Sequence, residues 1–183
     1  MEIPTGVLPA IRNMKDFERV LETDHHTLVL LETRLSQLKN IVTYAKRAKR
    51  KVFIHIDLIQ GLRADEYGME FLLREIKPDG ILSTRANVIN LAKKNNLLAI
   101  QRVFLLDSLS LDNSLRLLER SRPDCIEVLP GLIPSVIEKI HQKSGLPIIA
   151  GGLIATEDEI TQVIDAGAVA VSTSNKDLWN YAR

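Results

Sequence analysis

The sequence is poor in several features that define other protein classes, and each shortage narrows the choice. Its 183 residues include one cysteine, Cys125, which excludes an intrachain disulfide framework and fits a reducing compartment. Aromatic residues make up only 4%, so few rings are available on which nucleic-acid bases could stack. The formal net charge is +1, so no global field attracts the chain to nucleic acid or to a membrane. Any anion-binding site must therefore be local.

Long hydrophobic runs are also missing. No apolar run is long enough to cross a bilayer, and the residues from Met1 to Gly6 lack the basic and apolar regions of a signal peptide. We therefore expect a soluble, cytoplasmic protein without a membrane partner. Hydrophobic residues account for 45% of the chain, which predicts a single domain over residues 1–183 around one sizeable core.

Short apolar runs alternate with segments of helical periodicity from end to end, which is the pattern of an α/β protein. The expected strands are Val7–Arg12, His26–Glu32, Val52–Ile59, Gly80–Thr84, Leu98–Phe104, Cys125–Leu129, Pro147–Ala150 and Ala168–Ser172. A helical segment follows each of them, so the sequence predicts a compact (β/α)₈ barrel of the TIM type. The alternative, a doubly wound sheet, usually has fewer strands and a glycine-rich first turn, whereas the turn Arg12-Asn13-Met14 contains no glycine.

The segment from Ile148 to Asn175 carries the clearest functional signal. Gly151 and Gly152 end the seventh predicted strand, and Thr173-Ser174-Asn175 end the eighth. Glycines let the backbone approach an anion closely, while hydroxyl groups, amides and helix N-termini supply hydrogen-bond donors. Because the loops after strands seven and eight often bind phosphate in such barrels, these five residues are predicted to bind the phosphate of a small ligand.

Charged residues at other strand ends indicate the rest of the ligand. Asp57 and Glu127 stand among Ile, Val and Leu, where an unpaired charge is costly, and their carboxylates suit hydroxyl groups. Arg12 and Arg85 end strands one and four and suit an anionic group. An internal network of salt bridges that fills a small barrel is the alternative explanation for these charges.

Two further charge features each have two interpretations. Gln101 and Arg102 are neighbours on the fifth strand, so only one of them faces the barrel interior. The basic run from Lys46 to Lys51 ends the second predicted helix, away from the proposed ligand face. A solvated helix end is the simpler interpretation of this run, and a contact patch for nucleic-acid phosphates is the alternative.

No constellation of residues predicts catalysis. His55 and Asp57 lie two apart, as metal ligands on one strand face can, but a catalytic metal site usually has three protein ligands. A hydrogen-bonded core histidine is the favoured interpretation of His55. Cys125 stands in an apolar strand without a basic neighbour and is predicted to be inert. We therefore predict no catalytic residue, no metal and no cofactor.

Several strings in fixed order resemble one protein family over nearly the whole chain. They are Leu8-Pro9-Ala10-Ile11-Arg12-Asn13-Met14-Lys15, His55-Ile56-Asp57-Leu58-Ile59-Gln60-Gly61-Leu62, Asp65-Glu66-Tyr67-Gly68, Ile76-Lys77-Pro78, Ser83-Thr84-Arg85, Ala99-Ile100-Gln101-Arg102-Val103-Phe104-Leu105-Leu106-Asp107, Ile126-Glu127-Val128-Leu129-Pro130-Gly131 and Ser172-Thr173-Ser174-Asn175. Together they resemble the glycerol-3-phosphate-responsive antiterminators, which regulate glycerol uptake operons.

The resemblance implies a regulator built on a phosphate-binding barrel. Its effector would be glycerol 3-phosphate, and its second partner would be the leader mRNA of glycerol utilisation genes, where it prevents premature termination. This ligand matches the residues, because it offers one phosphate and two hydroxyl groups and requires no chemistry. The oligomeric state, including a homo-oligomer, is left open. The rival hypotheses are a TIM-barrel enzyme acting on a small phosphosugar, either an isomerase or a lyase, and a phosphate-ligand sensor whose partner is a protein.

Overall fold

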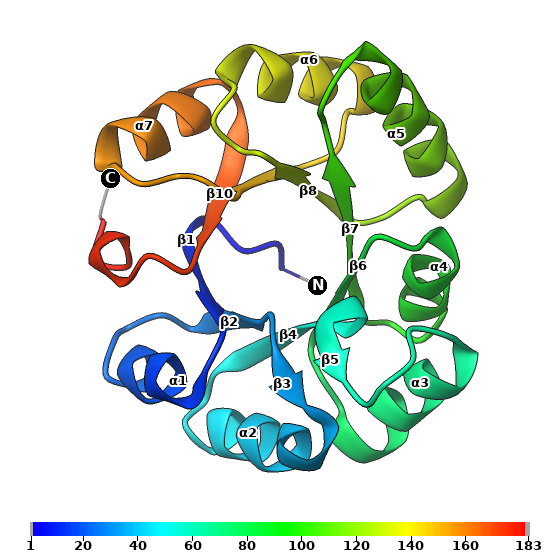
Figure 1. Ribbon diagram of the computed structural model, residues 1–183, viewed down its shortest axis with the longest axis vertical. Coiled ribbons are helices and arrows are strands. Elements are labelled where there is room, and N and C mark those ends of the chain that lie inside the picture. The colour runs from blue at the N-terminus through cyan, green and yellow to red at the C-terminus, as the bar shows by residue number, and fades with distance from the viewer. Residues whose placement is uncertain (1, 182–183) are drawn as a thin grey trace.

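The computed structural model describes residues 2–181 and forms one closed barrel surrounded by helices (Figure 1). Eight parallel strands follow one another in the order β1-β2-β4-β6-β7-β8-β9-β10, and β10 pairs with β1. The strands are β1 (Gly6–Ile11), β2 (Thr27–Leu30), β4 (Lys51–His55), β6 (Gly80–Ser83), β7 (Leu98–Phe104), β8 (Cys125–Leu129), β9 (Ile148–Gly151) and β10 (Ala168–Thr173). The predicted barrel is thus confirmed; of the predicted domain 1–183, Met1 and residues 182–183 lie outside the described residues.

Seven α-helices cover the barrel within residues 2–181, one fewer than the predicted eight helical segments. They are α1 (Met14–Leu21), α2 (Leu35–Arg47), α3 (Glu66–Phe71), α4 (Ala86–Lys94), α5 (Ser108–Ser121), α6 (Pro134–Ser144) and α7 (Glu157–Asp165). After β10 the chain forms a single 3₁₀ turn, Lys176–Leu178, in place of an eighth helix. None of the helices formed by the described residues has the length and apolar character needed to cross a bilayer.

The apolar core is divided by the barrel wall into an inner and an outer part. Because side chains alternate along a strand, Phe53 on β4 packs inside the barrel, while its neighbours Val52 and Ile54 pack against the helices. The inner part is small and includes Leu8, Val29, Phe53, Leu98, Ile100, Cys125, Ile149 and Ala170. Strands buried on both faces carry nearly continuous apolar runs, which is why the sequence located most of them.

The barrel interior changes from apolar to polar toward the carboxyl ends of the strands. Arg102 follows Ile100 by two positions on β7, and Glu127 follows Cys125 by two positions on β8. Both therefore occupy the next inward position on their strand. Ser172 on β10 reaches the same layer and contacts Glu127. The barrel therefore has an apolar base and a polar mouth, and its mouth is where ligand chemistry belongs in this fold.

The third predicted strand is shorter than expected. β4 ends at His55, and Ile56–Leu58 form a 3₁₀ turn instead of continuing the strand to Ile59. The Asp57 carboxylate accepts hydrogen bonds from the Ser83 hydroxyl group and from the Thr84 backbone N–H, and these bonds hold the turn against β6. The chain then adds a second, two-stranded sheet outside the barrel, in which β3 (Thr33–Arg34) pairs with β5 (Ile59–Gln60).

Candidate functional site

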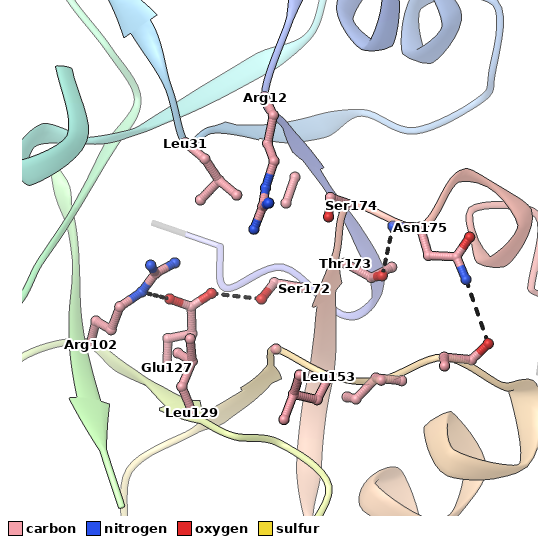
Figure 2. Close-up of a pocket in the computed structure, with 14 residues that line it drawn as sticks. Arg12, Leu31, Arg102, Glu127, Leu129, Leu153, Ser172, Thr173, Ser174 and Asn175 are labelled. Carbon is pink, nitrogen blue, oxygen red and sulfur yellow. Dashed lines mark hydrogen bonds and ion pairs between the residues drawn. The ribbon is translucent and has the colours of Figure 1, made fainter. Parts of the chain in front are cut away.

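A cavity of about 350 Å³ opens at the carboxyl ends of β1, β7, β8, β9 and β10 (Figure 2). Its walls are formed by Ala10, Arg12, Leu31, Arg102, Glu127, Leu129, Gly152, Leu153, Ile154, Ala155, Ser172, Thr173, Ser174 and Asn175. Of the nine residues predicted to bind a ligand, six line this cavity, namely Arg12, Glu127, Gly152, Thr173, Ser174 and Asn175. The other three, Gly151, Asp57 and Arg85, do not.

The loop after β9 exposes backbone to the cavity. Gly152 has φ +74°, and Leu153, which is 74% exposed, has φ +64°. A left-handed conformation is uncommon for a leucine and costs on the order of 1 kcal/mol. The N–H groups of Gly152 and Leu153 donate to no other residue within positions 2–181. Two uncommitted donors therefore lie in a strained loop at the cavity wall.

Gly151 stands behind the cavity rather than in its wall. A Cβ atom at this position would lie 2.7 Å from Ser172 Oγ and 3.2 Å from Glu127 Oε1. Its carbonyl oxygen accepts a 2.6 Å hydrogen bond from the Gly131 backbone N–H, which links the β8–α6 loop to β9. Gly151 thus leaves room for the polar contact between Ser172 and Glu127.

The loop after β10 is held by its own side chains. The Asn175 backbone N–H donates to Thr173 Oγ1 at 3.0 Å, and Asn175 Nδ2 reaches the Ala155 carbonyl oxygen of the β9–α7 loop at 3.5 Å. Trp179 Nε1 donates to the Thr173 carbonyl oxygen at 3.0 Å. The Ser174 hydroxyl group, by contrast, makes no hydrogen bond with the described residues. The two loops are therefore connected, and Ser174 remains available to a ligand.

A capping box at the N-terminus of α7 occupies some of the donors that the sequence suggested for this region. Glu159 Oε2 accepts hydrogen bonds from the backbone N–H groups of Ala155 at 2.7 Å and Thr156 at 3.0 Å, and both bonds lower the pKa of Glu159. The Thr156 hydroxyl group completes this capping box by accepting from the Glu159 N–H. The capping box therefore occupies the backbone N–H groups of Ala155, Thr156 and Glu159, and none of these three is available to a ligand.

A buried ion pair forms the opposite wall of the cavity. Arg102 Nε lies 2.5 Å from Glu127 Oε2, and the two side chains are only 10% and 1% exposed. Ser172 Oγ donates to Glu127 Oε1 at 2.6 Å, so both carboxylate oxygens are engaged. Arg102 and Glu127 are directly paired in the β7–β8 register. The terminal guanidinium nitrogens of Arg102 make no hydrogen bond with the described residues and remain free to contact a ligand.

Sequence reasoning left Arg102 outside the predicted ligand residues. Only one of Gln101 and Arg102 could face inward, and Gln101 faces the other way, where its Nε2 donates to the Ser83 carbonyl oxygen at 3.1 Å. Arg12 lines the same cavity and forms no ion pair with another described residue. Two guanidinium groups against the single carboxylate of Glu127 leave the cavity with a net positive charge, which suits an anionic ligand.

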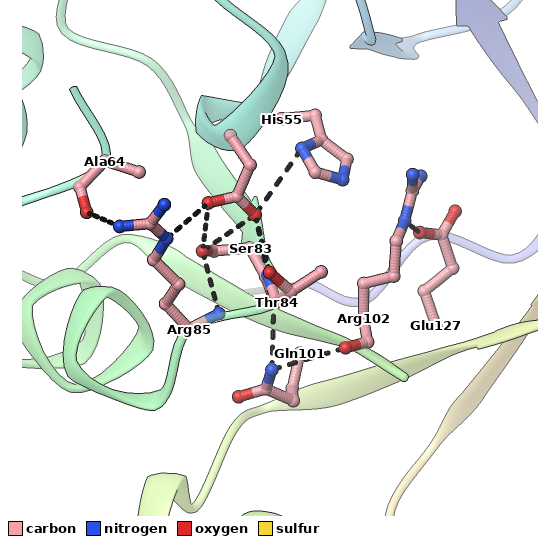
Figure 3. A network of polar contacts seen from close by, with 9 residues as sticks. His55, Ala64, Ser83, Thr84, Arg85, Gln101, Arg102 and Glu127 are labelled. Atoms are coloured by element: carbon pink, nitrogen blue, oxygen red, sulfur yellow. Dashed lines mark hydrogen bonds and ion pairs between the residues drawn. The ribbon is translucent and has the colours of Figure 1, made fainter. Parts of the chain in front are cut away.

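Asp57 and Arg85 lie outside the cavity lining, in a polar network that Gln101 connects to Arg102 through the Ser83 and Arg102 carbonyl oxygens (Figure 3). Asp57 Oδ2 accepts from the Thr84 N–H at 2.7 Å, and Asp57 Oδ1 lies 3.6 Å from Arg85 Nε. Arg85 Nη1 donates to the Ala64 carbonyl oxygen at 3.3 Å. These two charges therefore face each other across the β6–α4 loop, as the salt-bridge alternative anticipated, and the structure does not bring them to the cavity.

His55 is a core residue, but it is not hydrogen-bonded as expected. Its side chain is 2% exposed, its Nδ1 lies 3.8 Å from Asp57 Oδ2, and neither ring nitrogen has a hydrogen-bond partner among the described residues. Burial and the nearby positive charge of Arg102 lower its pKa from 6.5 to about 4, against the opposing effect of Glu127 and Asp57. The imidazole is therefore neutral at physiological pH. No group of three or more potential metal ligands occurs within residues 2–181.

Two other sequence features lie away from the cavity. Cys125 is fully buried, and burial together with the Glu127 charge raises the pKa of its thiol to about 12, which keeps it protonated. In the basic run, Lys46 contacts the Lys77 carbonyl oxygen and lies 3.6 Å from Asp79, while Arg50 donates to the Thr23 carbonyl oxygen at 2.6 Å. These contacts fit a structural role for the run at the base of the barrel.

Comparison with known proteins identifies the family. The family model described as glycerol-3-phosphate responsive antiterminator matches residues 7–179, so the chain belongs to this family of regulatory proteins. The protein YgcP of Escherichia coli (strain K12) is 34% identical over 177 residues, which cover 97% of this chain and 93% of that protein.

Solved structures agree with the family assignment. The glycerol uptake operon antiterminator regulatory protein of Listeria monocytogenes is 48% identical, with full coverage of both chains and a TM-score of 0.96. An antiterminator-related protein of Thermotoga maritima is 29% identical, with 98% and 100% coverage and a TM-score of 0.87. An aldolase at 13% identity, with 92% and 89% coverage and a TM-score of 0.70, shares the fold alone.

The buried neutral histidine makes stability depend on pH. Below pH 6.5 His55 binds a proton in the unfolded chain, whereas in the folded chain it binds one only near pH 4. The contribution of the neutral His55 to the free energy of unfolding is therefore complete above pH 6.5 and is lost as the pH falls toward 4. We expect His55→Gln to lose less stability than the wild type between pH about 7 and about 4.5, by on the order of 2 kcal/mol. Urea unfolding at both pH values measures the difference, and equal losses in the two proteins would contradict a depressed pKa.

Proposed function

We propose that the protein is a cytoplasmic, glycerol-3-phosphate-responsive antiterminator that binds the leader mRNA of glycerol utilisation genes and prevents premature termination. The observation that supports this proposal best is the distribution of groups around the 350 Å³ cavity. Uncommitted backbone N–H groups and a free hydroxyl group line one side, and guanidinium groups face them. A cavity of this size lies at the small end of the range for ligand sites, about 300–1,000 Å³.

The phosphate of glycerol 3-phosphate would occupy the side formed by the loops after β9 and β10. Gly152, Leu153 and Ser174 would donate to its oxygens, while Arg12 would neutralise its charge. Thr173 and Asn175 would shape this side by holding the β10 loop in place. Charge-assisted hydrogen bonds of this kind are roughly twice as strong as neutral ones.

The glycerol part would face the buried ion pair. The free guanidinium nitrogens of Arg102 are donors for its hydroxyl groups, and Glu127 and Ser172 provide the acceptor side of the same wall. Gly151 would contribute indirectly, since it leaves space for the Ser172–Glu127 hydrogen bond. The proposed phosphate and glycerol sides thus line one cavity.

The same geometry favours sensing over turnover. Both oxygens of Glu127 are already engaged, and His55 is buried outside the cavity lining, so neither is placed as a free general base. The two loops that would hold the phosphate are joined by the long 3.5 Å contact from Asn175 Nδ2 to the Ala155 carbonyl oxygen. A ligand that bridges them would order both loops and shift the population toward an RNA-binding form.

Calorimetry with glycerol 3-phosphate tests the ligand. We expect the wild type to bind glycerol 3-phosphate more tightly than inorganic phosphate and not to bind glycerol. Gly152→Asp should weaken binding by roughly tenfold or more, because it places a carboxylate beside the phosphate. The matched control is Gly145→Asp, since Gly145 also has a positive φ and a Cβ there meets no atom within 4 Å. Equal affinities of the two variants would contradict the assigned phosphate position.

Fluorescence anisotropy with a labelled leader transcript tests the RNA partner. Affinity should fall steeply as salt rises, with a slope of roughly −0.7 per phosphate contact on single-stranded RNA, and should increase when glycerol 3-phosphate is added. Gly152→Asp should keep basal RNA binding and lose the response to the ligand. An RNA affinity that is insensitive to salt or to glycerol 3-phosphate would contradict a ligand-gated RNA-binding protein.

A further inference from the structure

A second cavity, of about 430 Å³, lies at the carboxyl ends of β1 and β2 and shares Arg12 with the first. The helices α1 and α2, which contribute to its lining, are neighbours in the ribbon (Figure 1). The small sheet of β3 and β5 forms part of its wall. In this sheet Arg34 is aligned with Gln60, and both residues line the cavity. The chain therefore holds a cationic and an amide side chain together at a place that the phosphate site does not use.

The polar side chains of this second cavity are largely uncommitted. Arg12 and Arg34 form no ion pair with another described residue, and the exposed carboxamides of Gln37 and Gln60 form no hydrogen bond with one. Glu32 contributes one carboxylate against the guanidinium groups of Arg34 and of Arg12, and Arg12 is shared with the first cavity. Carboxamides offer a donor and an acceptor at once, which is the pattern needed to recognise the edge of a nucleobase.

Part of the lining of the second cavity is apolar, and we call this part its floor. The floor consists of Ile11, Leu30, Phe17 and Ile41, which are at most 7% exposed. A small phosphorylated polyol has no apolar surface that would match this floor. A nucleotide has, because it combines a flat base with a hydrogen-bonding edge and a phosphate.

We propose that this cavity holds one nucleotide of single-stranded RNA. This inference rests on the proposed function and specifies the RNA-contacting site, which the near-neutral net charge leaves undefined. Arg34 and Arg12 would contact phosphates, the carboxamides of Gln37 and Gln60 would contact the base edge, and the base would cover the apolar floor. A single recessed nucleotide requires no aromatic stacking platform, which agrees with the low aromatic content.

Arg12 connects the RNA site to the effector site, because it lines both cavities. A phosphate in the first cavity fixes the guanidinium group of Arg12, and the fixed group forms one wall of the second cavity. Any change that glycerol 3-phosphate causes in RNA affinity must be matched by an equal change that RNA causes in ligand affinity. Arg12→Gln should therefore bring the factor by which glycerol 3-phosphate changes the RNA affinity, and RNA the ligand affinity, closer to one.

Four single variants of the full chain test the assignment. Arg34→Gln and Gln37→Ala remove groups from the second cavity. Their matched controls, Arg116→Gln and Gln162→Ala, change exposed residues on α5 and α7. RNA affinity is measured by anisotropy with the leader transcript and saturating glycerol 3-phosphate, ligand affinity by calorimetry without RNA, and folding by thermal unfolding.

We expect Arg34→Gln to weaken RNA binding by roughly tenfold and Gln37→Ala by several-fold, with unchanged controls and unchanged affinity for glycerol 3-phosphate. If the wild type binds RNA and Arg34→Gln binds it as tightly as the control Arg116→Gln does, the nucleotide site is overturned. The proposed function stays intact in that case. A loss of ligand affinity in Arg34→Gln as large as its loss of RNA affinity would overturn it as well. No RNA binding by the wild type would overturn the proposed function, and the nucleotide site with it.

Discussion

The ion pair between Arg102 and Glu127 is the interaction on which the mouth of the barrel depends. Direct pairing of β7 with β8 brings the two residues together, and the second carboxylate oxygen of Glu127 is engaged by Ser172 from β10. The pair is buried, so removal of either partner would leave an uncompensated charge at a cost of about 3–5 kcal/mol. Gly151 makes this arrangement possible, because any Cβ atom at its position would displace the Ser172 hydroxyl group.

This fixed wall gives the two sides of the cavity different properties. Strand residues hold the ion pair rigidly, whereas the opposite side consists of loop backbone that includes the exposed, left-handed Leu153. A ligand that spans both sides would connect a rigid element to two adjustable loops, which is the geometry of a sensor. The neutral state of His55 follows from the same wall, since the Arg102 charge and burial both oppose its protonation.

The sequence was sufficient to predict the barrel and most of its strands, because runs that are buried on both faces and bounded by turn residues leave few alternatives. Leu98–Phe104 and Cys125–Leu129 have the predicted bounds. Periodicity could not predict the early end of β4, because that end depends on the contact of Asp57 with Ser83 and Thr84, which are distant in sequence. Periodicity also did not predict that, within residues 2–181, the eighth helical segment is a capped 3₁₀ turn, because this turn packs Trp179 onto the barrel end.

The candidate site was predicted in part. Small residues at the ends of β9 and β10 signalled the phosphate side, since their chemistry is local. Whether a strand-end charge faces a ligand or a partner depends on tertiary contacts, and Asp57 and Arg85 turn out to face each other. Arg102 was not assigned, because both faces of β7 are buried and alternation alone does not say which face is the interior.

Backbone amide NMR during a titration with glycerol 3-phosphate tests the central claim most directly. A ligand bound as proposed should shift the amide signals of Gly152, Leu153 and Ser174 together with the Nε–H signals of Arg12 and Arg102. Saturable shifts confined to other parts of the chain, such as the β6–α4 loop around Arg85, would contradict a phosphate site between the loops that follow β9 and β10.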